Sequence, residues 1–564
     1  MPLPEGFTPE VVIVGSGASG AMAAWVLARA GVKTLILEAG RAYSADETPM
    51  FDRGREAPLA GVGTEDKPFG YYDATVNGGW EVPGEPYTVG EGSSFRWWRA
   101  RMTGGRTNHW ARHVPRFGPY DFKPFTRDGH GVDWPISYAD IAPFYDRVEK
   151  LIGVSGGPLG LENHPDSPPS VLHAPPAPRV TELLVEAACN DLGIPCKPTH
   201  TAIITHDMPD EHAPRQACLN ATDCGRGCSI GAAFQTTTSL LPMALATGNV
   251  HILSNAMAAR VRTDARGRAT GVEYFDNGRA AFVPARVVVL GASACESARI
   301  LLNSRGPSAP NGLANSSGQV GRNLTDTVGA DFSARIPALE GRPRYNEDGI
   351  WMAHRYIPFW LYPEQAAGKL KFTRGYHIEL GGRFVEPSMG LDTGGDGYGA
   401  PLKRQVYDGF GSGLYFALRG EMIPNEHCYC ELDPAVKDRF GLPVLRFHWK
   451  WGEQELRMVD HAAEQVKRIV ERMGAKLHGP DRPAEERIAA GGSIIHEIGT
   501  ARMGADRRTS VTDSFGATWD VPNLLIVDGA VFASNPHKNP TLTMMALAMR
   551  NIEHLVGRMR KGDI

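Results

Sequence analysis

The chain has 564 residues, enough for two or more domains with cores of their own. Hydrophobic residues make up 42% and charged residues 22%, as in ordinary globular proteins, and the formal charge of −4 gives no reason to expect nucleic acid or an anionic membrane as a partner. No apolar run is long enough to span a bilayer, and the first residues, MPLPEGFTPE, lack the basic and apolar segments of a secretory signal.

The first forty residues predict a strand, a helix and a second strand. Residues 11–14, VVIV, are a buried strand, and an alanine-rich helix extends to about residue 30 before a strand at 34–37. The turn between strand and helix carries three glycines in the spacing G-x-G-x-x-G: Gly15, Gly17 and Gly20. Such glycines allow a tight turn and let backbone N–H groups meet a pyrophosphate at the helix N-terminus. The segment therefore predicts a dinucleotide site.

Glu38 closes the second strand, 18 residues after Gly20. An acid at this place accepts hydrogen bonds from an adenosine ribose, and its charge would repel a 2′-phosphate. The pattern supports dinucleotide binding, but it does not separate FAD from NAD.

The middle of the chain combines a proline-rich connection with a cysteine motif. Residues 155–180 are rich in proline and predict an extended connection, and residues 180–192 predict an amphipathic helix. Eight cysteines in a chain of this size are not a disulfide scaffold. Three of them follow the pattern C-x5-C-x3-C: Cys218, Cys224 and Cys228. A metal or iron–sulfur site and plain thiols in a glycine-rich loop both fit this spacing.

The rest of the chain predicts a second half of the dinucleotide fold and a separate sheet. A buried strand, a small-residue turn and a helix are expected within residues 286–304, and strand-like alternation dominates residues 331–450. We expect helices at 453–473 and 541–554 and a strand at 524–527. The predicted fold class is α/β, with a Rossmann-like FAD-binding domain and a substrate domain built on a mostly antiparallel sheet with helices.

Five segments together resemble the glucose–methanol–choline (GMC) oxidoreductases. They are the glycine turn, RMTGGRTNHWARHVPRFGPYDF, VVVLGASACESARILLNS, SIIHEIGTARMG, and the end of the chain from LLIVDGAVF to NPTLTMMALAMRNIEHL. The resemblance covers both ends and the middle of the chain and is weakest between about 331 and 450. It implies FAD as the cofactor.

The resemblance also implies the catalytic residues. His496 matches the histidine that accepts the hydroxyl proton while hydride leaves the carbon, and an imidazole suits this role because its unperturbed pKa is about 6.5. Asn539, which would orient the substrate hydroxyl, matches the family's second position, and His537 is a rival for that place. Further flavin contacts are expected from Gly104, Gly105, Asn108, His109, Asp528 and Thr541.

His109 lies in the segment GGRTNHW. In similar enzymes the histidine of such a segment can bond covalently to the flavin. A histidine that only packs against the ring is equally compatible, and the sequence leaves covalent attachment open.

Within the family, the cysteine spacing resembles the 3Fe–4S segment of bacterial sugar dehydrogenases. Cys218, Cys224 and Cys228 would then be the three thiolate ligands, and a zinc site is the alternative. Relatives of this kind can carry an adjacent Cys-Cys pair at the first ligand, whereas here Leu219 follows Cys218.

The resulting expectation is an FAD- and 3Fe–4S-dependent sugar dehydrogenase, most like glucoside 3-dehydrogenases, which oxidise the C3 hydroxyl and pass electrons to a cytochrome or other acceptor. Glucose 1-dehydrogenase, gluconate 2-dehydrogenase and fructose oxidation remain alternatives. An oxygen-using pyranose oxidase and a subunit with a vestigial flavin site are weaker ones. Relatives act in the periplasm after co-export with a small Tat-exported subunit; a cytoplasmic enzyme is the alternative.

The expected division of the chain follows these segments. The FAD-binding domain comprises residues 1–45, 90–150, 236–330 and 497–564. The iron–sulfur segment is 205–235, and the substrate-binding domain is 331–496.

Overall fold

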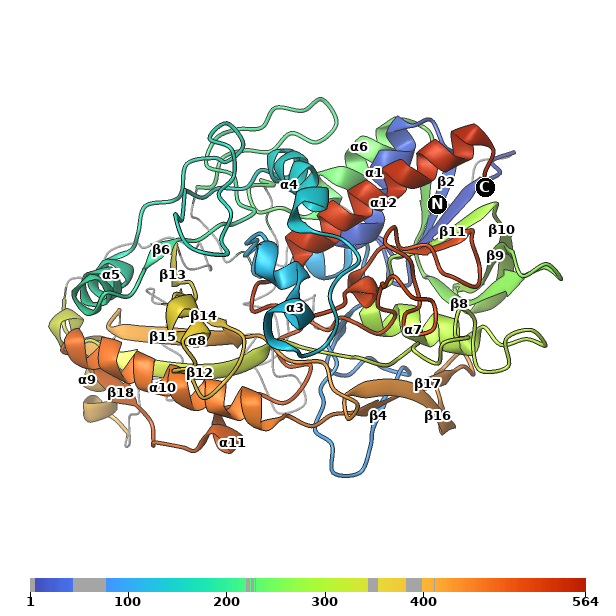
Figure 1. The fold of residues 1–564 in the computed structure, drawn as a ribbon. Coiled ribbons are helices and arrows are strands. Elements are labelled where there is room, and N and C mark those ends of the chain that lie inside the picture. Colours follow the sequence, from blue (N-terminus) through green and yellow to red (C-terminus); the bar gives the residue numbers. More distant parts are fainter. Residues whose placement is uncertain are drawn as a thin grey trace.

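The computed structural model describes residues 6–43, 78–219, 224, 228, 230–342, 354–381, 398–409 and 411–564. Figure 1 shows a parallel sheet with its helices at one end of the molecule and an antiparallel sheet with its helices at the other. Both chain termini lie near the parallel sheet (Figure 1).

The first sheet has five parallel strands in the order β19-β11-β1-β2-β7. Their bounds are Leu524–Ile526 for β19, Val287–Leu290 for β11, Val11–Val14 for β1, Thr34–Leu37 for β2 and Val250–Leu253 for β7. The continuous apolar runs of β1, β2 and β11 are buried throughout, as expected where both faces of a parallel sheet are covered.

Helices from distant parts of the sequence pack together over this sheet. α1 contacts α12 and α6, and α12 contacts α4 (Figure 1). Their bounds are Ala18–Arg29 for α1, Tyr138–Ile152 for α4, Leu240–Ala246 for α6 and Thr541–Lys561 for α12. An antiparallel sheet of β8 (Ala256–Thr263), β9 (Ala269–Asp276) and β10 (Arg279–Pro284) contacts β11 and α7 (Ala294–Asn303).

The second large sheet has six strands in the order β18-β12-β15-β14-β13-β6, all paired antiparallel. The strands are β6 Lys197–Pro198, β12 Val328–Arg335, β13 Arg355–Ile357, β14 Tyr376–Gly381, β15 Gly413–Gly420 and β18 Lys476–His478. α10 (Glu453–Arg472) packs on β12 and β15, and its neighbours are α5 (Val180–Leu192) and α11 (Ala484–Arg487).

Smaller elements complete the fold. A further three-stranded sheet joins β16 (Tyr429–Lys437), β17 (Pro443–His448) and β4 (Thr88–Val89), and β3 (Gly78–Gly79) pairs with β5 (Arg99–Ala100). Short helices are α3 (Pro124–Asp128), α8 (Tyr362–Ala366) and α9 (Ala400–Gly409).

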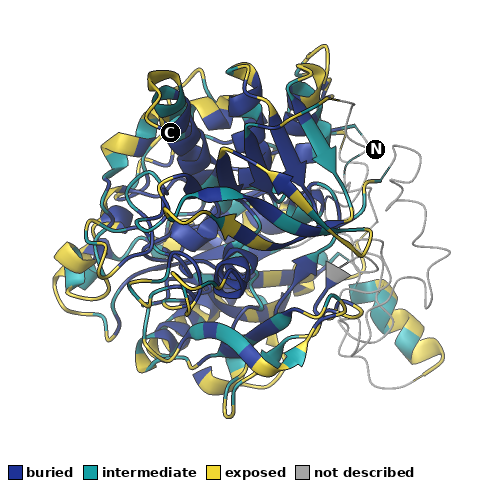
Figure 2. Cartoon of the chain, turned by 90° about the vertical axis from the view of Figure 1, so that its right-hand side faces the viewer, coloured by how far each residue is buried: buried dark blue, intermediate teal, exposed yellow. Residues whose placement is uncertain are grey.

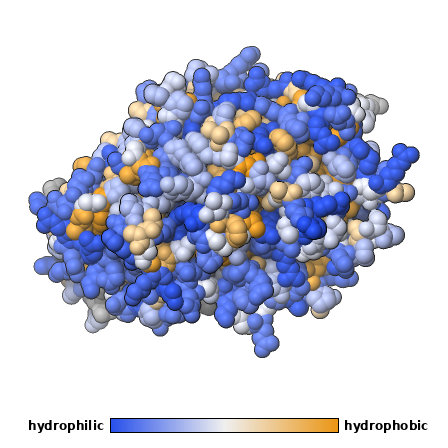
Figure 3. All heavy atoms as spheres, viewed as in Figure 1, coloured by the Kyte–Doolittle hydropathy of each residue, from blue (hydrophilic) through white to orange (hydrophobic). Residues whose placement is uncertain are grey.

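The predicted fold class is confirmed. The predicted strand and helix at the start of the chain and the amphipathic helix of α5 have the expected positions, and α12 continues seven residues beyond the predicted end at residue 554. Buried residues fill the interior in Figure 2, and exposed residues lie mainly at the periphery. On the face drawn in Figure 3, apolar residues occur in small groups among hydrophilic ones.

Candidate active site

The glycine turn between β1 and α1 has the geometry of a dinucleotide site. Gly15 has φ +95°, and a Cβ on it would lie 2.4 Å from the carbonyl oxygen of Gly291. A Cβ on Gly20 would lie 2.0 Å from the carbonyl oxygen of Gly15, so this glycine allows the helix to pack against the strand. A Cβ on Gly17 would meet nothing within 4 Å. Gly17 thus leaves the space through which a pyrophosphate can approach the N-terminus of α1.

Glu38 lies beside this turn at the end of β2. Its carboxylate accepts hydrogen bonds from the backbone N–H of Ser16 at 3.0 Å, from the Ser16 hydroxyl at 2.5 Å and from the N–H of Gly40 at 2.8 Å. Burial raises the pKa of Glu38, whereas these hydrogen bonds lower it. The carboxylate is therefore fixed at the mouth of the glycine turn, and its contact with a ribose stays a prediction.

The segment GGRTNHW forms a short 3₁₀ turn, Gly105–Asn108, next to the glycine turn. Gly104 and Gly105 both have positive φ, +87° and +53°. The Asn108 side chain donates to the carbonyl of Thr103 at 2.9 Å, which anchors the turn. In this conformation a Cβ on Gly105 would lie 3.6 Å from the Cα of Gly17, so the two predicted flavin-binding segments are in contact.

His109 follows this turn and is held neutral. Burial, and then the charges of Arg112 and Arg106, lower its pKa to about 3. Its Nε2 accepts a hydrogen bond from the Trp98 indole at 2.9 Å, so Nδ1 carries the proton, and that buried nitrogen has no hydrogen-bond partner in the protein. Nδ1 is thus the ring nitrogen still available to a cofactor.

A cavity of about 600 Å³ connects the glycine turn to the predicted catalytic residues. Its walls include the predicted residues Gly15, Gly17, Glu38, Gly105, His109, His496, Asp528, Asn539 and Thr541. Gly20, Gly104 and Asn108 support the wall from behind and do not line it. One continuous space therefore unites the dinucleotide site with the candidate catalytic centre.

Two predicted residues lie at the start of elements that face this cavity. Thr541 is the first residue of α12, whose N-terminus carries partial positive charge toward the cavity. Asp528 accepts hydrogen bonds from the N–H of Ala530 at 2.9 Å, the N–H of Ser293 at 3.1 Å and the hydroxyl of Ser297 at 2.5 Å, and burial raises its pKa to about 6. Asp528 therefore holds the turns that frame the cavity, and its contact with a flavin stays a prediction.

His496 is positioned by the two residues that precede β12. Its backbone N–H donates to the Asp326 carboxylate at 2.9 Å, and its Nδ1 lies 3.0 Å from the Thr327 hydroxyl. Burial, followed by the charge of Arg419, lowers the pKa of His496 to about 3. With Nδ1–H donating to Thr327, the neutral ring presents the lone pair of Nε2, which is the form a general base needs.

Asn539 lies opposite His496, with its Nδ2 3.5 Å from the Nε2 of His496. The rival His537 is also buried, but it does not line the cavity, and its Nδ1 lies 3.5 Å from the Nδ1 of His377. Lys538, between them, is buried and bonds Asp121 and the carbonyl of Asn163, each at 2.6 Å. The structure thus brings Asn539 and His496 together on the cavity wall.

Four further residues at this centre were missed by the sequence analysis: Glu379, Arg419, His113 and His377. Glu379 accepts hydrogen bonds from His113 at 2.8 Å, His377 at 3.4 Å and Asn539 at 3.3 Å, and Arg419 lies 3.5 Å from its other oxygen. The alternation of His377 and Glu379 along β14, which puts both side chains on one face, was the available signal. Nothing in the local sequence shows that this face meets His496.

The three cysteines of the C-x5-C-x3-C motif lie in one cluster. Cys224 packs with Ile203 and Ala233, and Cys218 and Cys228 pack against the same group. The N–H of Ala233 points at the sulfur of Cys228 at 3.4 Å. Within the described residues, ligand atoms of three metal-binding side chains approach to within 4.8 Å of one another at His113, His377 and Glu379 alone. The cysteine sulfurs are therefore spread more widely than thiolates around one zinc ion, which lie about 3.8 Å apart.

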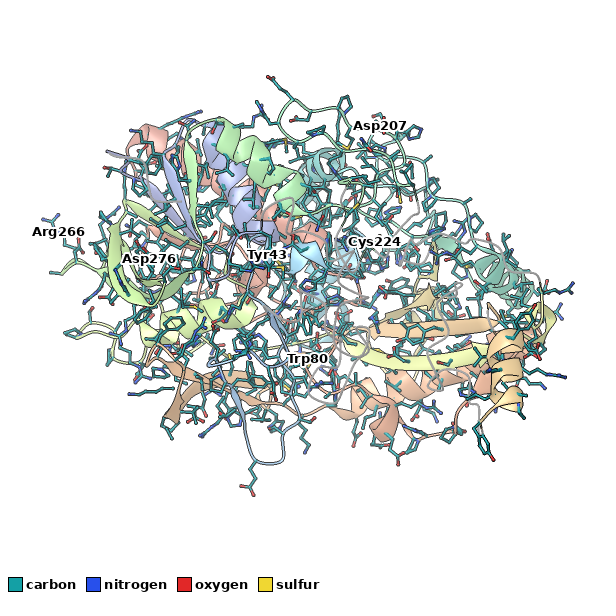
Figure 4. All side chains as sticks on the ribbon, turned by 180° about the vertical axis from the view of Figure 1, so that it is seen from behind. Tyr43, Trp80, Asp207, Cys224, Arg266 and Asp276 are labelled. Carbon is teal, nitrogen blue, oxygen red and sulfur yellow. The ribbon has the colours of Figure 1, made fainter. Side chains whose placement is uncertain are left out.

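The cysteine cluster is tied to the segment GGRTNHW. Arg112, fully buried, donates to the carbonyl of Cys224 and to the carbonyl of Asn108 at 3.1 Å. Gln235 donates to the same Asn108 carbonyl and accepts from the N–H of Cys228, both at 3.2 Å. Figure 4 places Cys224 near the middle of the molecule. The predicted iron–sulfur and flavin segments are thus neighbours.

No described helix is both long and apolar enough to cross a membrane.

A glycine turn, an acid on the second strand and a neutral histidine in one cavity define a dinucleotide-dependent oxidoreductase. Two family models described as GMC oxidoreductase match residues 127–328 and 424–548. A family model described as FAD binding domain matches residues 8–47. The chain belongs to the GMC oxidoreductase family, uses FAD and acts on CH–OH groups.

The chain is similar along its whole length to proteins of known activity. It is 30% identical to 2-methyl-1,2-propanediol dehydrogenase of Mycolicibacterium austroafricanum, with 97% of this chain and 95% of that protein covered. It is 26% identical to the fructose dehydrogenase large subunit of Gluconobacter japonicus, with 99% of each chain covered. Among solved structures, pyridoxine 4-oxidase from Mesorbium loti has the same fold, with a TM-score of 0.64, 17% identity and coverage of 97% and 99%.

Proposed function

We propose that this protein is the catalytic subunit of a sugar dehydrogenase that oxidises a secondary hydroxyl, with C3 of glucosides as the first candidate. The observation that carries the proposal is the pairing of neutral His496 with Asn539 on the wall of the cavity that also contains the glycine turn. FAD bound along that turn supplies the acceptor for the hydride that leaves the sugar carbon.

The protein's own residues handle the proton. Nε2 of His496 accepts the hydroxyl proton. A hydride, which carries the electron pair of the C–H bond, leaves the carbon that bears this hydroxyl, so that the alcohol becomes a ketone. Thr327 and Asp326 fix the imidazole, because one bonds Nδ1 and the other the backbone N–H. A side-chain N–H of Asn539 orients the substrate oxygen.

The cysteine cluster supports a route by which electrons leave the flavin for an external acceptor. Thiolates are the ligands of iron–sulfur clusters, and ligands that bind different irons stand further apart than those around one zinc ion. Cys218, Cys224 and Cys228 would hold a 3Fe–4S cluster, and hydrogen bonds through Arg112 and Gln235 join their loop to the flavin segment. By resemblance to bacterial sugar dehydrogenases, we also propose a small exported partner subunit and a cytochrome acceptor in the periplasm.

Two substrates test whether oxidation occurs at C1. The experiment is anaerobic dye reduction with methyl α-glucoside beside free glucose. The methyl group blocks the anomeric hydroxyl, so turnover of the glycoside is the expected result and excludes obligatory C1 oxidation. Turnover of glucose alone would contradict the C3 proposal.

A diol dehydrogenase is the second candidate, because the relative at 30% identity acts on 2-methyl-1,2-propanediol. The same assay with that diol tests it. Reduction of the dye by the diol and by neither sugar would replace the sugar proposal.

Iron analysis tests the cluster separately. We expect about three irons per chain in the wild type, which fall in Cys218→Ser and Cys228→Ser while FAD is retained. Cys189→Ser, a buried cysteine on α5 away from the motif, is the matched control and keeps its iron. Zinc without iron in the wild type would contradict the proposal.

A further inference from the structure

Glu379 is the meeting point of four polar side chains at the candidate catalytic centre. One oxygen of its carboxylate accepts hydrogen bonds from His113 at 2.8 Å, Asn539 at 3.3 Å and His377 at 3.4 Å. Nε of Arg419 lies 3.5 Å from the other oxygen. The proton transfer proposed above does not use Glu379, although this residue lines the same cavity.

The carboxylate is ionised. Burial alone would raise the pKa of Glu379, but the charge of Arg419 and the hydrogen bonds from His113 and His377 outweigh it and hold the pKa well below the usual range. An ionised carboxylate accepts hydrogen bonds and donates none. Each neighbour must therefore turn a donor toward it.

This requirement decides the orientation of the Asn539 amide. Its Nδ2 lies between Glu379 and Nε2 of His496, at 3.3 and 3.5 Å, while its Oδ1 is buried without a hydrogen-bond partner. A flipped amide would place Oδ1 against the carboxylate oxygen and the imidazole lone pair, which are both acceptors. The orientation in which Nδ2 faces both acceptors is therefore the favourable one, although it leaves Oδ1 without a partner in the protein.

The amide nitrogen has two N–H groups. One is directed to Glu379, and the other remains on the side of His496, where the proposed function places the substrate hydroxyl. We infer that Glu379 is a positioning residue, which acts through Asn539 by fixing the amide so that an N–H, rather than the carbonyl oxygen, faces the reacting oxygen. The inference rests on the proposed function.

A metal ion is the competing interpretation, because His113, His377 and Glu379 offer ligand atoms within 4.8 Å of one another. The Arg419 guanidinium beside the carboxylate disfavours a cation there, and hydrogen bonds between the two imidazoles and the carboxylate already account for the short distances. The orientation of Asn539 is explained without an ion.

A double-mutant cycle tests the inference. The variants are Glu379→Gln, Asn539→Ala and the pair, each assayed by the limiting rate of anaerobic flavin reduction with the substrate on which the wild type turns over best. We expect Glu379→Gln to lower this rate about 10- to 100-fold in the wild-type background, because a displaced amide no longer meets the reacting oxygen. In the Asn539→Ala background the same substitution should have little further effect.

Two readouts separate positioning from other roles. The loss should fall on the limiting rate and leave KM nearly unchanged, and deuterium at the reacting carbon should still slow the step. His461→Gln is the matched control for folding. His461 lies in α10, forms a hydrogen bond with the Tyr376 hydroxyl and does not line the cavity. FAD content and the unfolding temperature are measured for every variant.

The outcomes that overturn the inference are distinct. Equal losses in both backgrounds would show that Glu379 acts independently of Asn539, and a loss confined to KM would make it a substrate contact. Stoichiometric zinc that persists in Cys218→Ser, with activity lost on chelation, would establish the metal site at His113, His377 and Glu379 instead. Absence of turnover with any alcohol would refute the proposed function, and the inference would fall with it.

Discussion

His496 is half-buried on the cavity wall, and its desolvation keeps the Nε2 lone pair free of a proton. A desolvated imidazole resists protonation because the charged form loses its hydration, and the neighbouring Arg419 adds to this effect. The ring therefore stays neutral throughout the physiological pH range. A base of low pKa takes up a proton from bulk water only weakly. Transfer of the substrate's hydroxyl proton to His496 therefore depends on hydride leaving the carbon that bears this hydroxyl.

We expect His496→Ala to lower the rate of sugar-dependent flavin reduction by about 10²- to 10⁴-fold, the usual contribution of a general base. The measurement is anaerobic stopped-flow reduction, with FAD content determined on the same sample. Because FAD binding relies on the glycine turn rather than on His496, the cofactor should be retained. An unchanged reduction rate would refute the assignment of His496 as the base.

His354 predicts a pH dependence of stability. Burial, and then the charge of Arg179, lower its pKa from 6.5 to about 4, while its Nδ1 bonds the carbonyl of Ala177 at 2.6 Å. A depressed pKa means that the unfolded chain binds the proton first as the pH falls. The neutral form of His354 therefore contributes stability that is complete above pH 6.5 and is lost as the pH falls toward 4.

The matched variant is His354→Asn, whose amide can keep the bond to Ala177 without titrating. Urea unfolding at pH 8 and pH 5 should show that the wild type loses about 2 kcal/mol more than this variant between the two values. The same loss in both proteins would contradict the pKa direction.

Among the single residues of the candidate site, sequence patterns predicted some and missed others for a physical reason. His496 and Asn539 were found because each lies in a contiguous motif, and the structure brings them to one cavity. Glu379 and Arg419 lie on neighbouring strands of a sheet whose pairing joins residues far apart in sequence. Their partnership depends on that pairing, which no local pattern encodes.

Within the β1–α1 unit, Gly20 and Gly17 have different roles, helix packing and cofactor binding, and a pair of variants distinguishes these roles. We expect Gly20→Ala to destabilise the protein even without FAD by about 1–3 kcal/mol or more, since its Cβ would lie 2.0 Å from the Gly15 carbonyl oxygen. Gly17→Ala meets nothing within 4 Å and should leave the apoprotein stable but weaken FAD binding.

Thermal unfolding of the apoprotein and FAD titration together distinguish the two variants. Equal stability of both apoproteins would contradict the packing role of Gly20. Unchanged FAD affinity in Gly17→Ala would remove this glycine from the pyrophosphate path.

Elements were easier to predict than their partners. Residues 180–192 form the amphipathic helix that their apolar spacing predicted, because that spacing is local. The predicted end of the last helix at residue 554 was too early: α12 continues to Lys561 and ends before Gly562, which has φ +78°. The sequence also predicted a sheet between 331 and 450, but β6 and β18 join it from outside that range, and such edge strands carry little signal of their own.

A buried arginine links α3 to two strands of the second large sheet. Arg374, just before β14, bonds Asp128 at the end of α3 and Glu421 just after β15, and its side chain is 1% exposed. Removing the cation would leave Glu421 buried without its partner. We expect Arg374→Met to cost about 3–5 kcal/mol of unfolding free energy, as for other broken buried pairs.

The exposed pair Arg457–Glu453 on α10 provides the control, and Arg457→Met should cost about 1 kcal/mol or less. Chemical denaturation at pH 8 measures both. Equal costs for the two variants would show that the Arg374 network contributes no more than a surface pair.

Arg112 has a consequence for how the whole protein matures. Its guanidinium donates to the carbonyls of Cys224 and Asn108, so we expect the loop proposed to carry iron and the turn proposed to face the flavin to order together. Two ligands that order the same contact between loops strengthen each other's binding by the same factor. Assembly of the cluster should therefore tighten FAD retention, and flavin loading should protect the iron to an equal degree. A cell short of either cofactor would accumulate chains that hold the other cofactor less tightly.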